Sequence, residues 1–213
     1  MKCMKKPSKK AFTHIYKEAI WGTNEEGNGT SGYGSTLHFN TKYIDFMKKF
    51  IDRYNIQTIV DIGCGDWQFS NYIYYDRNVE YYGYDCVKHI IKKNKKDYSM
   101  VKSYHFECID GEYILDGVNT CADLLIMKDV LQHWTNNMII DFIIDLFNNS
   151  NYKYILITND HTTSTNIDIK LGEYRQINWK SAPFDSLHEL YEFTEIFSFD
   201  NLDNKTTMLL TPK

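Results

Sequence analysis

The chain has 213 residues, 43% of them hydrophobic, and a formal net charge of −4 at neutral pH. This length and composition suit one buried core, and no linker rich in proline, glycine or serine divides the chain. A negative charge argues against broad electrostatic binding of nucleic acid, which depends on Lys and Arg at the phosphates. We therefore expect a small-molecule or sugar substrate rather than nucleic acid.

Five cysteines with no Cys-x-x-Cys pair indicate reduced thiols and a cytoplasmic protein. The basic start has no apolar segment behind it, and no run of about 18 apolar residues occurs, so we expect neither secretion nor a membrane span. The sequence leaves the oligomeric state open.

Helices and strands alternate along most of the predicted chain. A helix over residues 9–21 precedes a glycine-rich loop over residues 22–35, which is expected to be either a lid over an active site or a surface loop. An amphipathic helix is then predicted, with Thr41 as its N-cap. The later elements are predicted, in chain order, as strand 58–62, helix 69–75, strand 80–84, helix 87–94, strand 102–106, strand 122–127, helix 137–147, strand 154–158 and a hairpin of strands 191–199 and 206–210.

This order predicts an α/β fold: a seven-stranded, mostly parallel Rossmann-like sheet with helices on both faces and a C-terminal antiparallel β-hairpin. Residues 1–56 are expected to form N-terminal helices and the lid loop, packed on the core. Residues 57–213 are expected to form that core as a single globular unit.

The first predicted strand ends in an acid and two glycines. Asp61 is followed by Gly63 and Gly65, which permit a tight turn and a close approach of ligand to backbone. A second acid, Asp85, ends the next strand 24 residues after Asp61. A carboxylate at about this spacing can accept hydrogen bonds from both hydroxyls of a ribose. The sequence therefore predicts a site for a nucleotide-like cofactor.

The residues around the turn distinguish between cofactors. A dinucleotide site has a third glycine, whereas Asp66-Trp67-Gln68-Phe69 follows Gly65 here. Asp61 and Asp66 would repel a pyrophosphate, which normally binds at such a helix N-terminus. They suit the sulfonium and amino groups of S-adenosylmethionine, so we expect this cofactor rather than NAD.

Together these motifs resemble those of the class I S-adenosylmethionine-dependent methyltransferases over residues 59–213. The resemblance rests on residues 60–65, Asp85, Asp110 and residues 128–133. Residues 21–36, 65–69 and 156–160 are also similar to a bacterial and viral subgroup that occurs near glycan and surface-polysaccharide biosynthesis. The resemblance implies an enzyme that methylates a small molecule or a sugar or glycan precursor, at oxygen or nitrogen.

The resemblance also implies roles at the cofactor. Asp61, Gly63 and Gly65 would hold the methionine moiety, and Asp85 would hold the ribose. Asp110 or its neighbour Ile109 would face the adenine, with Cys86 and Val87 on either side of it. The remaining cofactor-binding candidates are Cys64, which is interpreted as a packing residue, Asp66, Trp67, for which a place in the core is the alternative, and Lys128.

His133 is the candidate general base. It follows Asp129 by four residues, a spacing that places both side chains on one face of a helical turn. Asp129 would orient His133 or bind an acceptor amine, and Lys128 would position an acid or hydroxyl of the acceptor. The alternative is a histidine that caps or packs the next helix. The candidates for acceptor binding are Asn159, Asp160, Tyr174 and Arg175, the last of which is otherwise a solvated loop residue.

The same motifs admit three alternatives. Asp129 and the pair Asn159-Asp160 occupy positions comparable to those that hold Mg²⁺ in some catechol-type methyltransferases, but the other motifs of that family are absent, so we expect no metal. A nucleic-acid methyltransferase, acting on an RNA cap or a base, would show a basic face or an Asn-Pro-Pro-Tyr-like motif, and the sequence shows neither. A non-catalytic partner protein that binds S-adenosylmethionine is the third alternative.

Overall fold

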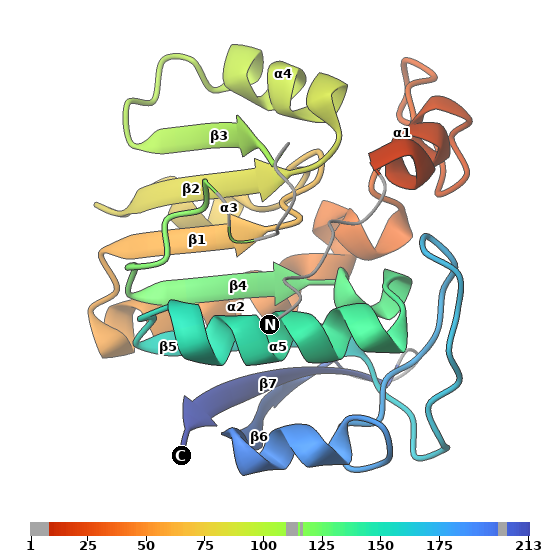
Figure 1. Cartoon of the computed structure of the whole chain (residues 1–213). Helices are drawn as coiled ribbons and strands as arrows, with labels where there is room; N and C mark the ends of the chain where they lie inside the picture. Colours follow the sequence, from red (N-terminus) through yellow and green to blue (C-terminus); the bar gives the residue numbers. More distant parts are fainter. Residues whose placement is uncertain (1–8, 110–114, 116, 200–203) are drawn as a thin grey trace. The chain divides into compact units, whose positions relative to one another are not determined.

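The computed structural model describes residues 9–109, 115, 117–199 and 204–213. The seven strands found among them are β1 (Thr58–Ile62), β2 (Glu80–Asp85), β3 (Tyr104–Cys108), β4 (Leu124–Lys128), β5 (Tyr154–Asp160), β6 (Tyr191–Ser198) and β7 (Lys205–Pro212). They form one sheet in the order β3-β2-β1-β4-β5-β7-β6 (Figure 1). β1, β2 and β3 run parallel, as do β4 and β5, whereas β7 is antiparallel to β5 and β6. The predicted seven-stranded, mostly parallel α/β fold with its antiparallel hairpin is confirmed.

The chain divides into two compact units, Lys9–Asp110 and Gly111–Lys213, called the N-terminal and C-terminal units below. The predicted division into residues 1–56 and 57–213 stays a prediction. The helices of the N-terminal unit are α1 (Lys9–Lys17), η1 (Tyr33–Ser35), α2 (Leu37–Tyr54), α3 (Asn71–Tyr74) and α4 (Lys88–Asp97), and those of the C-terminal unit are η2 (Leu131–His133), α5 (Asn136–Asn149) and η3 (Asp185–Glu189). None of these helices is both long and apolar enough to span a membrane.

The start of α2 differs from the prediction. Its N-cap is Thr36, whose side chain accepts a hydrogen bond from the backbone N–H of Phe39. The predicted cap, Thr41, lies inside the helix and donates its hydroxyl to the carbonyl of His38 at 2.8 Å. The prediction was wrong because the apolar stripe begins one turn later than the helix itself. That extra turn is held by Asn40, whose amide donates to the carbonyls of Gly34 and Thr36.

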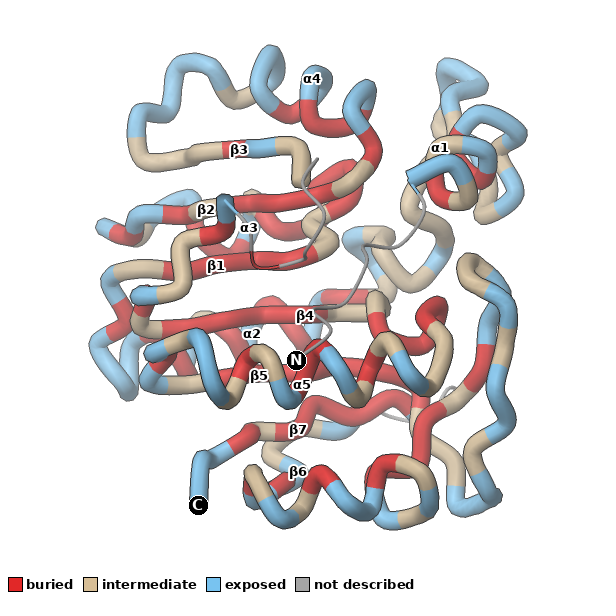
Figure 2. The backbone as a smooth tube through the Cα atoms, viewed as in Figure 1, coloured by how far each residue is buried: buried red, intermediate tan, exposed pale blue. Residues whose placement is uncertain are grey.

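The core of the N-terminal unit lies between α2 and the buried strands β1 and β2. The apolar face of α2 is buried along its length, and Ile59 and Val60 of β1 are fully buried. Figure 2 draws most of β1 in red, the colour of buried residues. Next to them is an aromatic cluster around Trp67, whose ring centroid lies 4.4 to 6.1 Å from those of its neighbours Tyr74, Tyr81, Tyr98, Tyr104 and Phe106. This packing fixes the backbone from which the turn after β1 leaves the sheet.

The C-terminal unit has its own core. All the residues of β4 before Lys128 are buried, and α5 buries one stripe made of Ile139, Phe142, Ile143 and Leu146. The side chain of Thr135 caps α5 by accepting from the N–H of Met138. In the connection from β5 to β6, Asn178 N–H donates to Asn166 Oδ1 and the Asn166 amide donates to the Asn178 carbonyl, both at 2.8 Å. These bonds shape the long segment that carries Tyr174 and Arg175.

Candidate functional site

The acid-and-glycine turn after β1 is tied to the end of β2 inside the N-terminal unit. The backbone N–H groups of Gly63 and Cys64 both donate to the carbonyl of Tyr84, at 2.7 and 3.0 Å. Gly63 and Gly65 have φ values of +80° and +56°, which glycine adopts without strain. The Asp85 carboxylate accepts from the N–H of Gly65 at 3.1 Å and from the N–H of Val87 at 2.8 Å. The structure therefore brings together the two sequence features that predicted a cofactor.

Asp85 is a buried carboxyl group, 8% exposed. Burial raises its pKa to about 6, although its hydrogen bonds from the backbone N–H groups of Val87 and Gly65 lower it. Because the folded chain holds this proton more tightly than the unfolded chain, the contribution of Asp85 to stability falls as the pH rises from about 4 to about 6. A buried carboxylate that costs stability at neutral pH is typical of a functional site.

Asp61 is held from the side of the aromatic cluster. The hydroxyl of Tyr81 donates to Asp61 Oδ2 at 2.7 Å, and the indole of Trp67 donates to the Tyr81 oxygen at 2.8 Å. Trp67 is only 2% exposed, so its ring is a core residue, the alternative that the sequence left open. It orients Asp61 through Tyr81 and lies outside the proposed cofactor site.

The glycine-rich loop packs on this turn through Ser31. The N–H of Ser31 donates to Asp66 Oδ2 at 3.2 Å, and the N–H of Asp66 donates to Ser31 Oγ at 3.0 Å. The Tyr16 hydroxyl lies 2.6 Å from the same Ser31 oxygen. Burial raises the pKa of Tyr16 well above its usual value, and the charges of Asp85 and Asp66 raise it further. Tyr16 therefore stays a neutral hydroxyl beside the turn, a position that no sequence pattern predicts.

A side chain at Gly65 is expected to disturb the contact between the turn and the loop. A Cβ there would lie 2.4 Å from Ser31 Oγ, whereas a Cβ at Gly27, which also has positive φ, would meet nothing within 4 Å. Both alanine variants have backbone strain of about 1–2 kcal/mol, but Gly65→Ala adds a clash worth about 1–3 kcal/mol. Urea denaturation is expected to show a clearly larger loss of stability for Gly65→Ala than for Gly27→Ala. Equal losses would contradict the packing of the loop on the turn.

Other cofactor candidates lie around these strand ends. The N–H of Ile109 donates to the Asp85 carbonyl at 2.9 Å, and Val87 is fully buried. Burial, followed by the charge of Asp85, raises the pKa of the Cys64 thiol well above its usual value, which agrees with a packing role. The Cys108 thiol donates a weak hydrogen bond to the carbonyl oxygen of Cys86. Asp110 lies outside the described residues.

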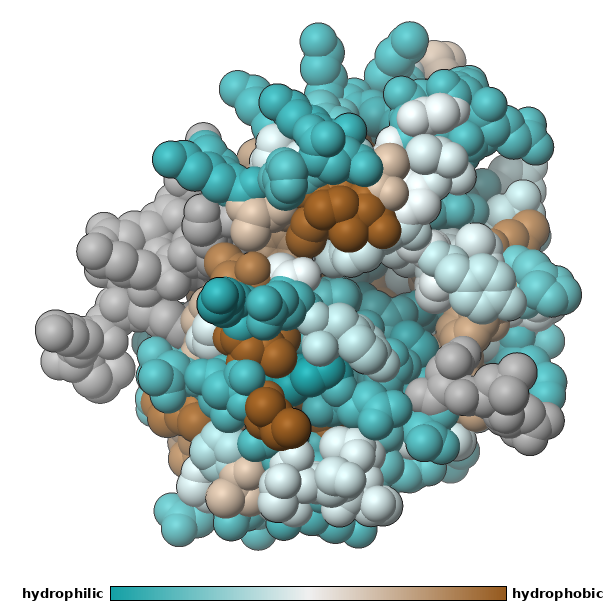
Figure 3. All heavy atoms as spheres, turned by 90° about the vertical axis from the view of Figure 1, so that its right-hand side faces the viewer, coloured by the Kyte–Doolittle hydropathy of each residue, from teal (hydrophilic) through white to brown (hydrophobic). Residues whose placement is uncertain are grey.

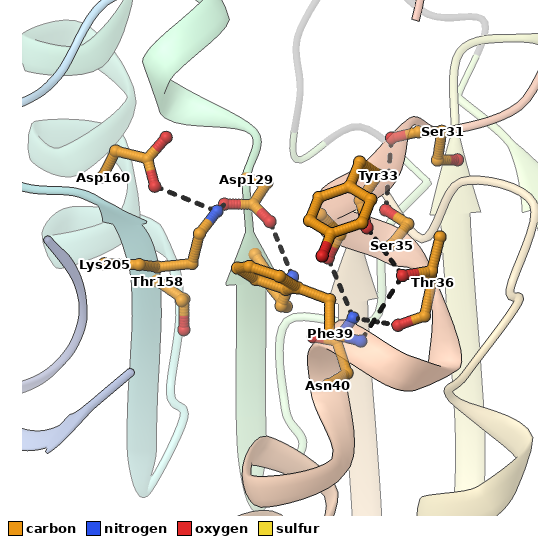
Figure 4. Close-up of polar contacts among 12 residues, drawn as sticks. Ser31, Tyr33, Ser35, Thr36, Phe39, Asn40, Asp129, Thr158, Asp160 and Lys205 are labelled. Carbon is orange, nitrogen blue, oxygen red and sulfur yellow. Dashed lines mark hydrogen bonds and ion pairs between the residues drawn. The ribbon is translucent and has the colours of Figure 1, made fainter. Parts of the chain in front are cut away.

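The C-terminal unit carries a network of buried charges at the ends of β4 and β5. Asp129, which has a φ of +59°, accepts from Lys128 Nζ at 2.6 Å and also from Lys205 Nζ. Lys205, the first residue of β7, lies 3.1 Å from the carboxylate of Asp160 as well. Its side chain is 4% exposed, and Figure 4 shows its ammonium between the two carboxylates. The hydroxyl of Tyr174 donates to the other oxygen of Asp160 at 2.6 Å.

The charged groups in this network shift one another's pKa values. Burial alone would raise the pKa of Asp129, but Lys128 and Lys205 outweigh it and hold that pKa at about 2. Burial alone would lower the pKa of Lys205, but Asp129 and Asp160 raise it above its usual value. Asp129 is therefore a permanent anion and cannot accept a proton near neutral pH. Lys205 bridges the two carboxylates that the metal alternative would use, and no cluster of three metal-ligating side chains occurs in the described part of the chain.

His133 is buried at the end of η2 with a defined tautomer. Its Nδ1 lies 3.0 Å from the carbonyl oxygen of Glu173. A carbonyl can only accept, so Nδ1 carries the hydrogen and Nε2 of the neutral ring carries a lone pair. Burial lowers the pKa of His133, more than the Glu173 hydrogen bond and the Asp129 charge raise it. The imidazole is therefore neutral and able to accept a proton at neutral pH.

The predicted acceptor-binding residues have different environments. Arg175 donates to Asn136 Oδ1 and to the carbonyls of Ile167 and Trp134, which ties the segment after β5 to the start of α5. It is 7% exposed and is therefore not a solvated loop residue. Asn159 is 3% exposed, and neither atom of its amide has a hydrogen-bond partner among the residues that the structure describes. An unsatisfied buried amide costs about 1–3 kcal/mol, which a ligand could recover.

No model of a protein family matches the chain, and no curated protein matches it in sequence. Its fold is similar to solved methyltransferases. An O-methyltransferase family protein from Burkholderia thailandensis gives a TM-score of 0.62 at 10% identity, over 83% of this chain and 57% of that protein. Magnesium protoporphyrin IX methyltransferase from Synechocystis PCC 6803, solved with S-adenosylhomocysteine (SAH), gives 0.59 at 12% identity, over 94% and 91%.

A third similar structure, N,N-8-amino-8-demethyl-D-riboflavin dimethyltransferase from Streptomyces davawensis, gives a TM-score of 0.58 at 15% identity, over 83% of this chain and 56% of that protein. The chain thus spans little more than half the length of two of the three. At these identities the likeness shows the fold alone, which is the Rossmann-like fold of S-adenosylmethionine-dependent methyltransferases.

Proposed function

We propose that this protein is an S-adenosylmethionine-dependent methyltransferase that acts on a small molecule or a sugar, such as a glycan precursor, in the cytoplasm. The cofactor supplies a methyl group activated by a sulfonium. The fold supports the proposal, and the arrangement at Asp85 carries it.

The residues at the turn fit this cofactor. A carboxylate offers about four acceptor positions. At Asp85 the backbone N–H groups of Gly65 and Val87 use two of them, and Cys86 adds a further backbone hydrogen bond. The remaining capacity suits a hydroxyl of a ribose. Asp61 and Asp66 add negative charge beside the turn, which favours a cationic methionine moiety over the pyrophosphate of NAD.

The chemistry proposed for the C-terminal unit is proton removal from the acceptor by His133. The pKa of Asp129 is too low for that task, whereas the neutral His133 ring holds a lone pair at Nε2. Methyl transfer otherwise needs mainly alignment, so a base contributes only where the acceptor must lose a proton. Lys128, Asn159, Asp160 and Tyr174 are proposed to position the acceptor. Arg175 is proposed to support them by holding their segment.

The role of Asp85 is tested with two ligands, SAH and an SAH analogue that lacks the ribose 2′-hydroxyl. If Asp85 accepts from that hydroxyl, the unaltered protein binds the analogue at least tenfold more weakly than SAH, because a hydrogen bond to a charged group is worth about 1.5–3 kcal/mol. In Asp85→Ala the two ligands are expected to bind equally, whereas the exposed control Asp97→Ala should keep the difference. Calorimetric titration measures all six affinities.

The pH dependence gives a second measurement on the same residue. With a pKa of about 6, the Asp85 carboxylate is protonated at pH 5, and SAH affinity is expected to fall about tenfold from pH 7 to pH 5. The assignment would be contradicted if Asp85→Ala still bound SAH more tightly than the analogue, or if SAH affinity did not change between pH 7 and pH 5.

A further inference from the structure

The hydrogen-bond ladder between β4 and β5 breaks off beside the charged network of the C-terminal unit. Its last bond runs from the N–H of Asp129 to the carbonyl of Thr158 at 2.9 Å. A regular parallel ladder would continue with a bond from the N–H of Asp160 to the carbonyl of Asp129. Asp129 instead has a φ of +59°, in the left-handed region, which turns the chain out of the strand. The N–H of the buried Asp160 therefore needs another acceptor.

The side chain of Gln132, in η2, supplies that acceptor. Its Oε1 accepts from the N–H of Asp160 at 3.1 Å, and the residue is 5% exposed. Because a backbone N–H can only donate, it is the oxygen of the amide that faces β5, and this fixes the orientation of the whole side chain. Gln132 thus takes the place of a strand carbonyl and holds η2 at the end of β5.

The backbone of η2 is bonded to a second part of the same unit, the connection that follows β5. The N–H of Arg175 donates to the carbonyl of Gln132 at 3.1 Å. The N–H of Gly172 donates to the carbonyl of His133 at 2.9 Å. The bond from His133 Nδ1 to the Glu173 carbonyl joins the same two segments. The position of the His133 ring therefore depends on how η2 is anchored, and the Gln132 amide is its anchor to β5.

Asp160 extends this arrangement to the other residues proposed to bind the acceptor. Its carboxylate accepts from the hydroxyl of Tyr174 at 2.6 Å and lies 3.1 Å from the ammonium of Lys205. The ring centroid of Tyr174 lies 6.2 Å from that of His133. Gln132 bonds to the backbone of Asp160 and precedes His133 in the chain, so a shift of its side chain displaces the two relative to each other.

We propose that Gln132 is a positioning residue: its amide sets the place and the tautomer of the His133 ring relative to Asp160, and thereby the rate at which His133 takes a proton from the acceptor. This role rests on the proposed function, in which His133 is the base. The surface at this end of the C-terminal unit, in the lower half of Figure 3, is mostly hydrophilic or intermediate in hydropathy (teal to white), which suits a polar acceptor.

The first experiment is proton–nitrogen NMR of the histidine rings in the full chain, with Gln132→Met and Gln132→Glu. Methionine has a similar length and lacks the amide oxygen, whereas glutamate keeps an oxygen that can accept from Asp160. His133→Ala identifies the His133 signals among the seven histidines. The hydrogen is expected to stay on Nδ1 in the unaltered protein and in Gln132→Glu, and to be shared between both ring nitrogens in Gln132→Met. The control Gln57→Met changes an exposed glutamine and should leave the His133 signals unchanged.

The second experiment is methyl transfer from S-adenosylmethionine to a panel of sugars and small amines. Gln132→Met is expected to lower kcat about tenfold to a hundredfold, because a small displacement of the base costs rate. The KM for S-adenosylmethionine should change by less than about twofold. Gln132→Glu should recover most of the lost rate, and Gln57→Met should behave like the unaltered protein.

A cooperative urea transition shows that each variant is folded. If Gln132→Met does not fold, Gln132→Asn takes its place, since its amide is one methylene too short to reach Asp160. The proposal is overturned if the variant without this contact keeps the hydrogen on Nδ1 and its full rate, or if Gln132→Glu loses both to the same extent. If the unaltered protein transfers no methyl group, the proposed function fails, while the NMR spectra still decide whether Gln132 positions the His133 ring.

Discussion

Replacing His133 with alanine is expected to lower turnover by about 10² to 10⁴, the usual contribution of a general base, and to leave SAH affinity nearly unchanged. The reason is the tautomer of the ring: Nδ1 donates to the Glu173 carbonyl, so Nε2 of the neutral imidazole is the proton acceptor. The measurement is transfer of a labelled methyl group from S-adenosylmethionine to the acceptor that the unaltered protein uses fastest in a panel of phosphorylated sugars and small amines.

The pH profile separates a base from a structural histidine. Since burial lowers the pKa of His133, the unaltered enzyme should lose activity only below about pH 6.5, and the variant should lose this acidic limb. The control is His105→Ala, because His105 is a half-exposed residue paired with Glu80. A normal rate and profile in His133→Ala would instead mean catalysis by alignment of an acceptor that arrives unprotonated.

Replacing Lys205 with methionine is expected to destabilise the protein by about 3–5 kcal/mol, because it removes one partner from a buried ion-pair network and leaves Asp160 without its ammonium. Chemical denaturation at pH 7 measures the loss. Lys153→Met is the control, since Lys153 makes its ion pair with Asp123 while 72% exposed, and it should change stability little.

The pH dependence of that loss follows from Asp129. Its pKa is about 2 in the folded protein and near 3.8 otherwise, so its stabilising contribution is complete above about pH 4 and disappears as the pH falls toward 2. The difference between the unaltered protein and Lys205→Met should therefore shrink in acid. A variant as stable as the Lys153→Met control at pH 7 would contradict the network.

The sequence predicted best what depends on neighbouring residues. β1 has the predicted bounds because Thr58–Ile62 is an apolar run closed by Gly63 and a turn. The contact between the turn after Asp61 and Asp85 follows from their spacing, since ends of adjacent parallel strands meet at one edge of a sheet. Trp67 stayed ambiguous because an aromatic residue after a turn can cover a ligand or enter the core, and only its five ring neighbours decide between the two.

What the sequence could not predict involves partners far apart along the chain. Lys205 is 76 residues from Asp129 and lies between the two predicted strands of the hairpin. Ser31 is 35 residues from Asp66, in a loop that the sequence predicts only as a lid or a surface loop. Arg175 resembled a ligand-binding loop residue because its acceptors include backbone carbonyls, which have no sequence signature. The pattern of apolar and polar residues along the chain predicts strands and turns, whereas these long-range contacts depend on how the segments pack.

Calorimetric titration of the full chain with SAH and, separately, with NAD tests the central claim most directly. The acid-and-glycine turn and the carboxylate of Asp85 should give a dissociation constant on the order of micromolar for SAH, with no detectable binding of NAD. If SAH fails to bind up to about 1 mM, or if NAD binds more tightly than SAH, the protein is not an S-adenosylmethionine-dependent methyltransferase.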